Sequence, residues 1–178
     1  SDLKDQYLAL STTGLWAWGF ETGVLDGTLT TSAAFQKIQT PIGGDTITKL
    51  PLGVSPSDVT MFVASHQTLM LVANGNVWIL TQASANIQGD GSVLSSTTWH
   101  KVKINNTTDL TNVIAVRGQV SSASLNAFMA LTSDGTVYTW GSSTYLGNSS
   151  AITTKNYATL MTLPSEFSST NKPKMIGV

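Results

Sequence analysis

A strand–turn–strand pattern recurs three times along this chain, at an interval of about sixty residues. The copies share a central turn glycine and span residues 8–19 around Gly14, 69–81 around Gly75 and 128–141 around Gly135. The three glycines are 61 and 60 positions apart, and Asn74 and Asp134 precede two of them. Asn-Gly and Asp-Gly are strong signals for a hairpin turn, because both residues of each pair tolerate a positive φ. A chain with this period is expected to fold as similar units that pack against one another.

The strand after each turn repeats one order of side chains: an aliphatic residue, an aromatic residue, a spacer and a large residue. The copies are Leu15-Trp16-Ala17-Trp18, Val77-Trp78-Ile79-Leu80 and Val137-Tyr138-Thr139-Trp140. Residues two positions apart lie on the same face of a strand. We therefore expect the second and fourth members to form a repeated core between units: Trp16, Trp18, Trp78, Leu80, Tyr138 and Trp140. A ligand platform of exposed rings is the weaker interpretation, because the pattern recurs together with the hairpin.

Further apolar segments predict about four strands in each unit. Closing strands are expected near 35–38, 99–102 and 157–160, and opening strands near 59–63, 113–116 and 175–178. The predicted units are 1–58, which is incomplete at its start, 59–112, 113–174, and 175–178 as the start of a further unit.

Short strands, frequent glycine turns and the absence of sustained helical periodicity predict an all-β fold. A long period with about four strands per unit is typical of propeller blades. The predicted fold is therefore a partial β-propeller of about three blades, each blade a four-stranded antiparallel sheet. A β-sandwich with accidental self-similarity is the alternative.

Residues 130–141 carry the clearest family resemblance. Their sequence, Ala-Leu-Thr-Ser-Asp-Gly-Thr-Val-Tyr-Thr-Trp-Gly, resembles the signature of the regulator of chromosome condensation repeats; residues 8–19 are similar and 69–81 less so. The resemblance implies blades of a seven-bladed propeller. Members of that family include exchange factors for small GTPases, bacterial inhibitors of β-lactamases and repeats of secreted or cell-surface proteins. The glycine pair expected before each hairpin is reduced to Gly118 in the third unit, and no exchange-factor loop matches residue by residue.

The charge balance excludes some partners. Nine Lys and Arg against ten Asp and Glu give a formal net charge of −1, so no excess positive charge is available to neutralise phosphates. We predict no nucleic-acid partner. Charged residues are only 11% of the chain, so Ser, Thr, Asn and Gln must supply the polar surface. No apolar stretch approaches a membrane span of about 20 residues, and the chain has no Cys.

No catalytic, cofactor or metal motif stands out, and we predict no enzyme activity and no cofactor or metal. The nucleophile elbow, the phosphate-binding loop and the zinc-protease helix motif are absent from the sequence. His66 and His100 occupy different phases of the repeat without metal-like spacing, and His100 is expected to be a solvated strand residue. Gly89-Asp90-Gly91 is reminiscent of a calcium loop, but calcium takes about six to eight oxygen ligands, so a simple turn is favoured.

These features predict a non-enzymatic binding or structural module. Three blades do not close a ring, and open blades expose strand edges and apolar faces. The chain is accordingly expected to be a propeller segment of a larger secreted or cell-surface protein, adhesin-like or from a virion and of prokaryotic or viral origin. Alternatively, it is expected to self-assemble through Met175, Ile176, Gly177 and Val178 as an edge strand. The expected partner is a protein, a glycan, or further blades of the same or a neighbouring chain. The alternative is a regulatory propeller that acts through its loops as a GTPase exchange factor or an enzyme inhibitor.

Overall fold

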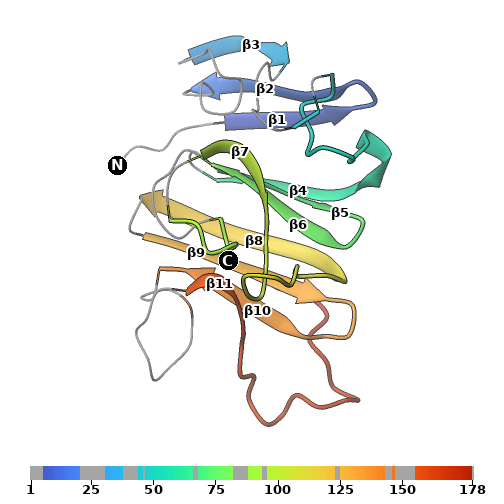
Figure 1. The fold of residues 1–178 in the computed structure, drawn as a ribbon, viewed down its shortest axis with the longest axis vertical. Helices are drawn as coiled ribbons and strands as arrows, with labels where there is room; N and C mark the ends of the chain where they lie inside the picture. Colours follow the sequence, from blue (N-terminus) through green and yellow to red (C-terminus); the bar gives the residue numbers. More distant parts are fainter. Residues whose placement is uncertain are drawn as a thin grey trace.

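The structure is a computed structural model that describes residues 6–20, 31–37, 44–45, 47–65, 68–81, 88–93, 96–122, 125–142, 146 and 155–177. These residues form three antiparallel β-sheets that follow one another along the long axis of the molecule (Figure 1). Across the described ranges the one helical element is a single 3-10 turn, η1 (Pro56–Asp58), and no helix is long enough to cross a membrane. The predicted all-β class is confirmed, and the second and third sheets are four-stranded antiparallel blades as predicted, while the described residues of the first form three strands.

Each sheet is built from consecutive strands. The first contains β1 (Gln6–Ser11), β2 (Gly14–Phe20) and β3 (Thr31–Lys37). The second contains β4 (Val59–Ser65), β5 (Thr68–Ala73), β6 (Asn76–Thr81) and β7 (Ser96–Lys101). The third contains β8 (Val113–Ser122), β9 (Leu125–Thr132), β10 (Val137–Gly141) and β11 (Lys155–Leu160). In every sheet the spatial order of the strands is their order in the chain. Of the segments expected to open units, 59–63 and 113–116 fall on β4 and β8, whereas 175–177 are not in a strand. The segments expected to close units fall on β3, β7 and β11, with Val102 just beyond β7 and Ile38 outside the described residues.

The central hairpins of the second and third sheets differ by one residue in their turns. Val72 pairs with Val77 across β5 and β6, and Leu131 pairs with Val137 across β9 and β10, which leaves one more residue in the third turn. Gly75 and Gly135 both lie within the turns and have positive φ angles of 72° and 86°. The strand registers align the two sheets despite this extra residue.

Gly14 does not lie within the first turn, which corrects the alignment of the three glycines. The turn is formed by Thr12 and Thr13, and Gly14 pairs with Ser11 as the first residue of β2. Its φ is +124°, and an added Cβ would lie 2.4 Å from the carbonyl oxygen of Thr48. The glycine is therefore required by the close approach of a neighbouring segment and not by the reversal of the chain.

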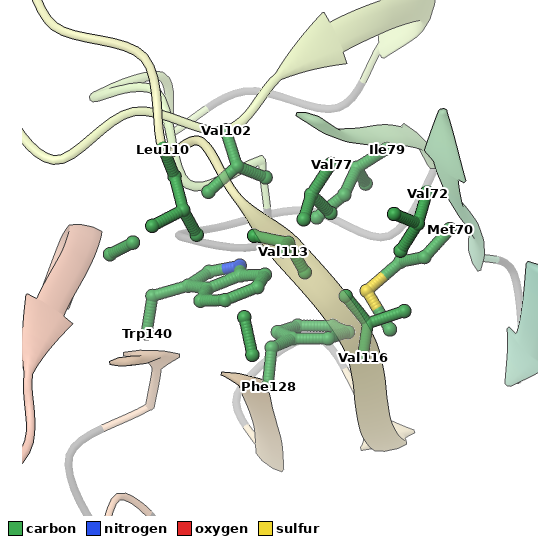
Figure 2. Close-up of a cluster of buried hydrophobic side chains, with 12 residues drawn as sticks. Met70, Val72, Val77, Ile79, Val102, Leu110, Val113, Val116, Phe128 and Trp140 are labelled. Carbon is green, nitrogen blue, oxygen red and sulfur yellow. The ribbon is translucent and has the colours of Figure 1, made fainter. Parts of the chain in front are cut away.

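The larger hydrophobic core lies between the second and third sheets (Figure 2). The second sheet contributes the buried side chains of Met70, Val72, Val77 and Ile79, and the third contributes Val116, Phe128, Ala130 and Trp140. The rings of Phe128 and Trp140 are stacked with their centroids 5.6 Å apart. Close packing here requires Gly118, where a Cβ would lie 2.5 Å from the Phe128 ring.

The second core lies between the first and second sheets and is built mainly from leucines. Its buried members include Leu15, Leu50, Leu69, Leu71, Leu80 and Trp99. Trp99 from β7 also donates its indole N–H to the Lys49 carbonyl at 3.0 Å. The second sheet is thus apolar on both faces, as expected for a blade between two others. The unit boundaries at 58/59 and 112/113 fall between the sheets and stay predictions.

Candidate interaction face

The hairpin turns of the three sheets lie along the same side of the stack, each against the segment that leads out of its sheet (Figure 1). The N–H of Leu15 donates to the Thr48 carbonyl at 3.2 Å, and the N–H of Val113 donates to the Gly75 carbonyl at 2.9 Å. At the third turn, an added Cβ on Gly135 would lie 2.7 Å from Cβ of Lys172. We call this side the turn face; it comprises the turns 12–13, 74–75 and 133–135 and the segments 44–45, 47–58, 102–112 and 161–173.

The three segments that lead out of the sheets carry the same type of polar turn at equivalent positions of the repeat. In each, one side-chain oxygen accepts hydrogen bonds from the backbone N–H groups two and three positions ahead. The acceptors are Asp45 Oδ1, Asn105 Oδ1 and Ser168 Oγ, and the bonds are 2.7–3.3 Å long. The N–H groups of Thr48 and Ile47 lower the pKa of Asp45. These turns give the face short, well-held loops whose hydrogen-bonding groups are satisfied locally.

A hollow of about 180 Å³ opens on the turn face between the segment that leads out of the second sheet and the hairpin of the third sheet. Hydroxyl and carboxylate groups dominate its lining, which includes Thr108, Asp109, Thr111, Asp134, Thr136 and Tyr138. It combines polar groups of this segment and of the third hairpin around the ring of Tyr138. We refer to it as the junction hollow.

Both carboxylates at the junction hollow are engaged by neighbouring groups. Asp134 accepts hydrogen bonds from the hydroxyl of Thr132 and the N–H of Thr136, and these contacts with Thr132 and Thr136 lower its pKa to about 2. Asp109 forms an ion pair with Lys101 at 2.9 Å. The hollow therefore offers carboxylate and hydroxyl acceptors that are already oriented, on a surface of low net charge.

A second hollow, of about 240 Å³, lies beside the third turn, and its lining is more apolar. It is bounded by Val137, Met161, Leu163, Phe167 and Pro173, together with the turn at Asp134. Phe167 is 40% exposed at its rim. We refer to it as the end hollow, because it lies on the third sheet and the segment that leads out of it.

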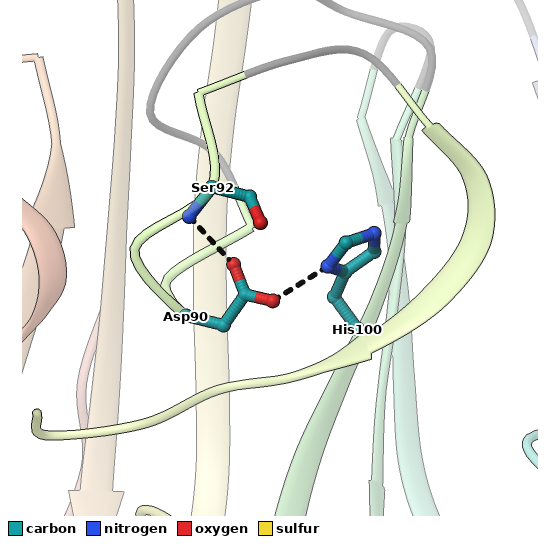
Figure 3. Close-up of polar contacts among 3 residues, drawn as sticks. All are labelled: Asp90, Ser92 and His100. Carbon is teal, nitrogen blue, oxygen red and sulfur yellow. Dashed lines mark hydrogen bonds and ion pairs between the residues drawn. The ribbon is translucent and has the colours of Figure 1, made fainter. Parts of the chain in front are cut away.

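Asp90 and His100 form a close contact at the outer side of the second sheet (Figure 3). Oδ2 of Asp90 is 2.6 Å from Nδ1 of His100, and Oδ1 accepts the Ser92 N–H at 2.9 Å. Burial raises the pKa of Asp90, but the hydrogen bonds from His100 and Ser92 and the charge of the imidazole outweigh it, so the pKa falls to about 2. The loop also joins the third sheet, since the Gly91 N–H donates to the Asn156 carbonyl at 3.0 Å.

The Asp90–His100 contact corrects the expectation that His100 is a solvated strand residue. Only 21% of its side chain is exposed, and it anchors a loop that lies between two sheets. Ser92 participates through its backbone N–H, so the three residues do not form a nucleophile–base arrangement. Within the part of the chain that the structure describes, no three His, Cys, Asp or Glu side chains gather as a metal site would need. His66 lies outside the described residues.

The repeated core positions of the second and third sheets lie in the two cores. Leu80 is 1% exposed in the core with the first sheet, and Trp140 is 0% exposed in the core with the second sheet. Trp78 and Tyr138 are half-buried and pack against the same two clusters. These four side chains therefore occupy equivalent places in successive junctions.

The equivalent positions of the first sheet are described only in part. Trp16 is half-buried, and its indole N–H donates to Ser11 Oγ at 2.9 Å. The backbone of Trp18 pairs with Tyr7, but both side chains lie outside the described residues.

The segment proposed as an edge strand has no strand partner among the described residues. Met175, Ile176 and Gly177 adopt no regular structure, and Met175 is 85% exposed. Val178 lies outside the described residues. Edge pairing by these residues stays a prediction.

Sequence reasoning missed the polar turns at Asp45, Asn105 and Ser168 and the contact between Asp90 and His100. The three polar turns make the same hydrogen bonds with different residue types, Asp, Asn and Ser, so the repeat alignment shows no constant residue at this position. A Thr or Asn two to three positions after an Asx or Ser, at a constant place in each unit, was the available signal. The Asp90–His100 contact depends on a loop that returns to its own sheet, for which periodicity gives no signal.

Comparison with known proteins supports the repeat and the fold. Residues 119–145 match the Regulator of chromosome condensation (RCC1) repeat, a range that includes the third hairpin. No curated protein matches the sequence significantly. Human WBSCR16 is similar in structure, with a TM-score of 0.61 and 16% identity over 90% of this chain and 38% of that one.

Two structures of the yeast protein Prp20 are also similar. Prp20p from Saccharomyces cerevisiae, studied with its binding to Gsp1p and histones, has a TM-score of 0.56 and 13% identity over 89% of this chain and 36% of that one. Yeast RCC1 (Prp20) bound by Kap60 has a TM-score of 0.53 and 16% identity over 92% of this chain and 34% of that one. The chain thus spans little more than a third of the length of these structures.

Proposed function

Starting from a chain built of RCC1-type β-propeller repeats, we propose that it is a protein-binding segment of a propeller and contacts its partner through the turn face. The observation that carries the proposal is the junction hollow, where loops of two sheets present oriented carboxylate and hydroxyl acceptors around Tyr138. Rigid sheets that hold short loops are a common way to build a binding surface. The similar Prp20p, whose structure was studied with its binding to Gsp1p and histones, supports a macromolecular partner.

Several features favour a protein over other ligands. The junction hollow is small, about 180 Å³, and its acceptors are matched by the backbone and side-chain donors of a polypeptide. The net charge of −1 gives no steering towards nucleic acid. No enzymatic step is proposed, because the polar groups at the turn face satisfy one another and form no nucleophile–base pair.

The experiment compares two exposed positions that receive the same substitution. Thr111→Arg places a bulky cation in the lining of the junction hollow, whereas Gln119→Arg places it on β8. A protein captured by the wild-type chain is identified, purified and titrated against both variants by biolayer interferometry. We expect Thr111→Arg to weaken binding at least about tenfold, equivalent to about 1.4 kcal/mol, and Gln119→Arg to leave it unchanged. If both variants bind the captured protein with equal affinity, the partner does not bind at the junction hollow and the proposal fails.

A glycan array tests the other ligand class. If the wild-type chain binds defined glycans there, and no protein binds it in a way that depends on Thr111, the partner is a carbohydrate and the proposal of a protein partner fails.

A regulatory propeller is the second candidate, and it is favoured by the acidic and aromatic groups Asp109, Asp134 and Tyr138 around one hollow. Once a partner is purified, its enzymatic or nucleotide-exchange rate is measured with increasing amounts of the chain. A rate that changes in proportion to occupancy supports regulation, and an unchanged rate at saturation leaves binding alone. The extracellular or cell-surface location stays a prediction, which protease treatment of intact producing cells would check.

A further inference from the structure

The junction hollow lies between two adjacent units of this chain, and its two sides are held together. One side is the segment that leads out of the second sheet, and the other is the third hairpin. The Ser133 N–H of the hairpin donates to the Asn112 carbonyl of the segment at 2.8 Å. Thr111 and Asp134 are exposed, one on each side, and Tyr138 is half-buried. A site that is already formed in this way loses little conformational entropy when a ligand binds.

The two carboxylates of the junction hollow retain the capacity to accept further hydrogen bonds. An ionised carboxylate offers about four acceptor positions. Asp109 uses Oδ2 for its ion pair with Lys101. Asp134 accepts the Thr132 hydroxyl and the Thr136 N–H through the same atom, Oδ1. A ligand with several N–H donors can therefore bond to both carboxylates without displacing these contacts.

The second sheet already holds a cation between an aromatic ring and a carboxylate. Nζ of Lys101 lies 4.9 Å from the ring centre of Trp78 and 2.9 Å from Oδ2 of Asp109. Lys101 of β7 is also the cross-strand partner of Trp78 in β6. This chain thus combines a cation–π contact with an ion pair at one partly exposed place.

Among the described residues, the third sheet has the ring of this arrangement without the cation. Tyr138 occupies the place of Trp78, but its cross-strand partner in β11 is Leu160. Asp109 lines the junction hollow together with Tyr138, so a carboxylate is present as well. A cation from another molecule can therefore do at Tyr138 what Lys101 does at Trp78.

Arginine is the cation whose chemistry fits these groups best. Its planar guanidinium carries five N–H donors, bonds carboxylates in pairs and stacks on aromatic faces, whereas the ammonium of lysine is a compact point charge. The hollow of about 180 Å³ is smaller than the roughly 300–1,000 Å³ of a site for a drug-sized ligand, so a single side chain suits it better. Arginine is also enriched among the side chains that dominate protein interfaces.

We propose that the partner inserts an arginine side chain into the junction hollow, with the guanidinium against the Tyr138 ring and bonded to Asp109 and Asp134. The inference rests on the proposed function, because it names the side chain by which a protein partner is recognised at the turn face. The charge of Lys172 also reaches Asp134, so an incoming guanidinium competes with this lysine.

The test uses single side chains as probes and does not require the partner. The isotope-labelled 178-residue chain is titrated with N-acetyl-arginine amide, and the backbone amide signals of Thr111 and Thr136 are followed by NMR. We expect a Kd on the order of 1 mM, as for a ligand of this size. N-acetyl-lysine amide should bind more weakly. The isosteric but uncharged N-acetyl-citrulline amide should leave the signals unchanged.

Two matched variants test the charge. Asp134→Asn keeps an acceptor for Thr132 and Thr136 but removes the charge, and it should weaken binding of the arginine probe about threefold to fivefold, as expected for an exposed ion pair. Asp58→Asn is the control, because Asp58 also accepts hydrogen bonds in a turn, from the Ser55 N–H and hydroxyl, but lies outside the junction hollow. The affinity of the Asp58→Asn variant should equal that of the wild type.

Two further variants test the ring and the competing lysine. Tyr138→Leu should weaken binding of the arginine probe, and a thermal melt checks that this variant is folded. Lys172→Ala should strengthen binding, because it removes the competitor for Asp134 at an exposed position.

Three results would overturn the arginine inference. They are equal shifts with the arginine and citrulline probes, no shift at about ten times the expected Kd, and an affinity that Asp134→Asn and folded Tyr138→Leu both leave unchanged. Each can occur while a captured protein still depends on Thr111. Conversely, a captured protein that ignores Thr111→Arg removes the proposed function, whereas the probe titration is measured without that protein. The two failures are therefore distinguishable.

Discussion

The two junctions between sheets fill the same places with different side chains. At the position where the second sheet has Leu80 against the first sheet, the third sheet has Trp140 against the second, and both are almost completely buried. Leu80 pairs across its sheet with Leu69, whereas Trp140 pairs with Phe128 and stacks on it. The repeat therefore conserves burial and register more strictly than residue type. The junction between the second and third sheets is filled by aromatic rings, whereas the junction between the first and second sheets is filled by leucines. Trp99 from an outer strand is added to the leucines.

Removal of the two equivalent side chains should have the largest effect on this comparison. We expect Trp140→Ala to lower the free energy of unfolding by about 3–5 kcal/mol and Leu80→Ala by about 2–5 kcal/mol, because each leaves a cavity in a close-packed junction. Urea denaturation of both variants and the wild type measures the losses. Leu80→Trp should also be destabilising, because the Leu80 site is already fully packed. A neutral Leu80→Trp would show that the two junctions are interchangeable in shape.

Gly118, which allows Phe128 to pack closely between the second and third sheets, provides the next test. Gly118→Ala places a Cβ 2.5 Å from the Phe128 ring and 2.7 Å from the Met70 methyl group, and we expect a loss of about 1–3 kcal/mol through overpacking. Gly53→Ala is the matched control, because its φ is +80° but its Cβ would contact nothing within 4 Å. Strain alone should cost about 1–2 kcal/mol there. If only Gly53→Ala destabilises, close packing around Phe128 is not limiting.

Acid titration compares two carboxylates with low pKa values, the partly buried Asp90 beside His100 and the exposed Asp134 in the third turn. The pKa of Asp90 is lowered to about 2, so its stabilising contribution is present above its unfolded value near 3.8 and is lost as the pH falls towards 2. Asp90→Asn should therefore be destabilising at pH 6, by about 1.5–3 kcal/mol for a charged hydrogen bond, and nearly neutral at pH 2. Asp134→Asn, at an exposed turn with a similarly low pKa, should show a smaller difference because of solvent screening. Thermal melts at both pH values measure the effect, and a larger loss for Asp134→Asn would contradict the assignment.

The smallest effect is expected at the outer strands. Lys101 lies 4.9 Å from the ring centre of Trp78 and pairs with Asp109, whereas Leu160 pairs with Tyr138 at the same place in the third sheet. Lys101→Leu converts the second sheet to the third-sheet pattern. We expect the stability to change by less than about 1 kcal/mol, because the ion pair is partly exposed. The difference in stability between the wild type and Lys101→Leu should disappear in high salt. A difference that does not depend on salt would be due to packing instead.

The sequence predicted those parts of the fold that recur with a constant chemistry. The hairpins around Gly75 and Gly135 and the outer strands are readable because apolar and turn residues return at a fixed interval. Gly14 was aligned one position out of register, because the first turn uses Thr12 and Thr13 and the glycine serves a contact with Thr48 that is distant in sequence. Local spacing carries no information about such contacts.

The candidate interaction face was predictable only in its composition. A neutral, hydroxyl-rich surface follows from the 11% charged residues, but the pairing of Asp134 with Thr132 and Thr136 follows from the longer third turn. The junction hollow also requires two sheets to be placed side by side. Its lining combines Thr108, from the segment that leads out of the second sheet, with Tyr138 of β10, thirty residues further along the chain.

The order of strands within each sheet has a consequence for how the molecule forms. Among the described residues, every strand pairs only with strands next to it in the chain, so the second and third sheets form their hydrogen bonds within their own units. Contacts of low sequence separation form quickly, because little chain entropy is lost in closing short loops. A nascent chain can therefore complete one sheet before the next has been synthesised, and the slow step becomes the docking of finished sheets. Until that docking occurs, the side chain of Trp140 on the third sheet stays exposed to water, although the second sheet that will bury it has already formed.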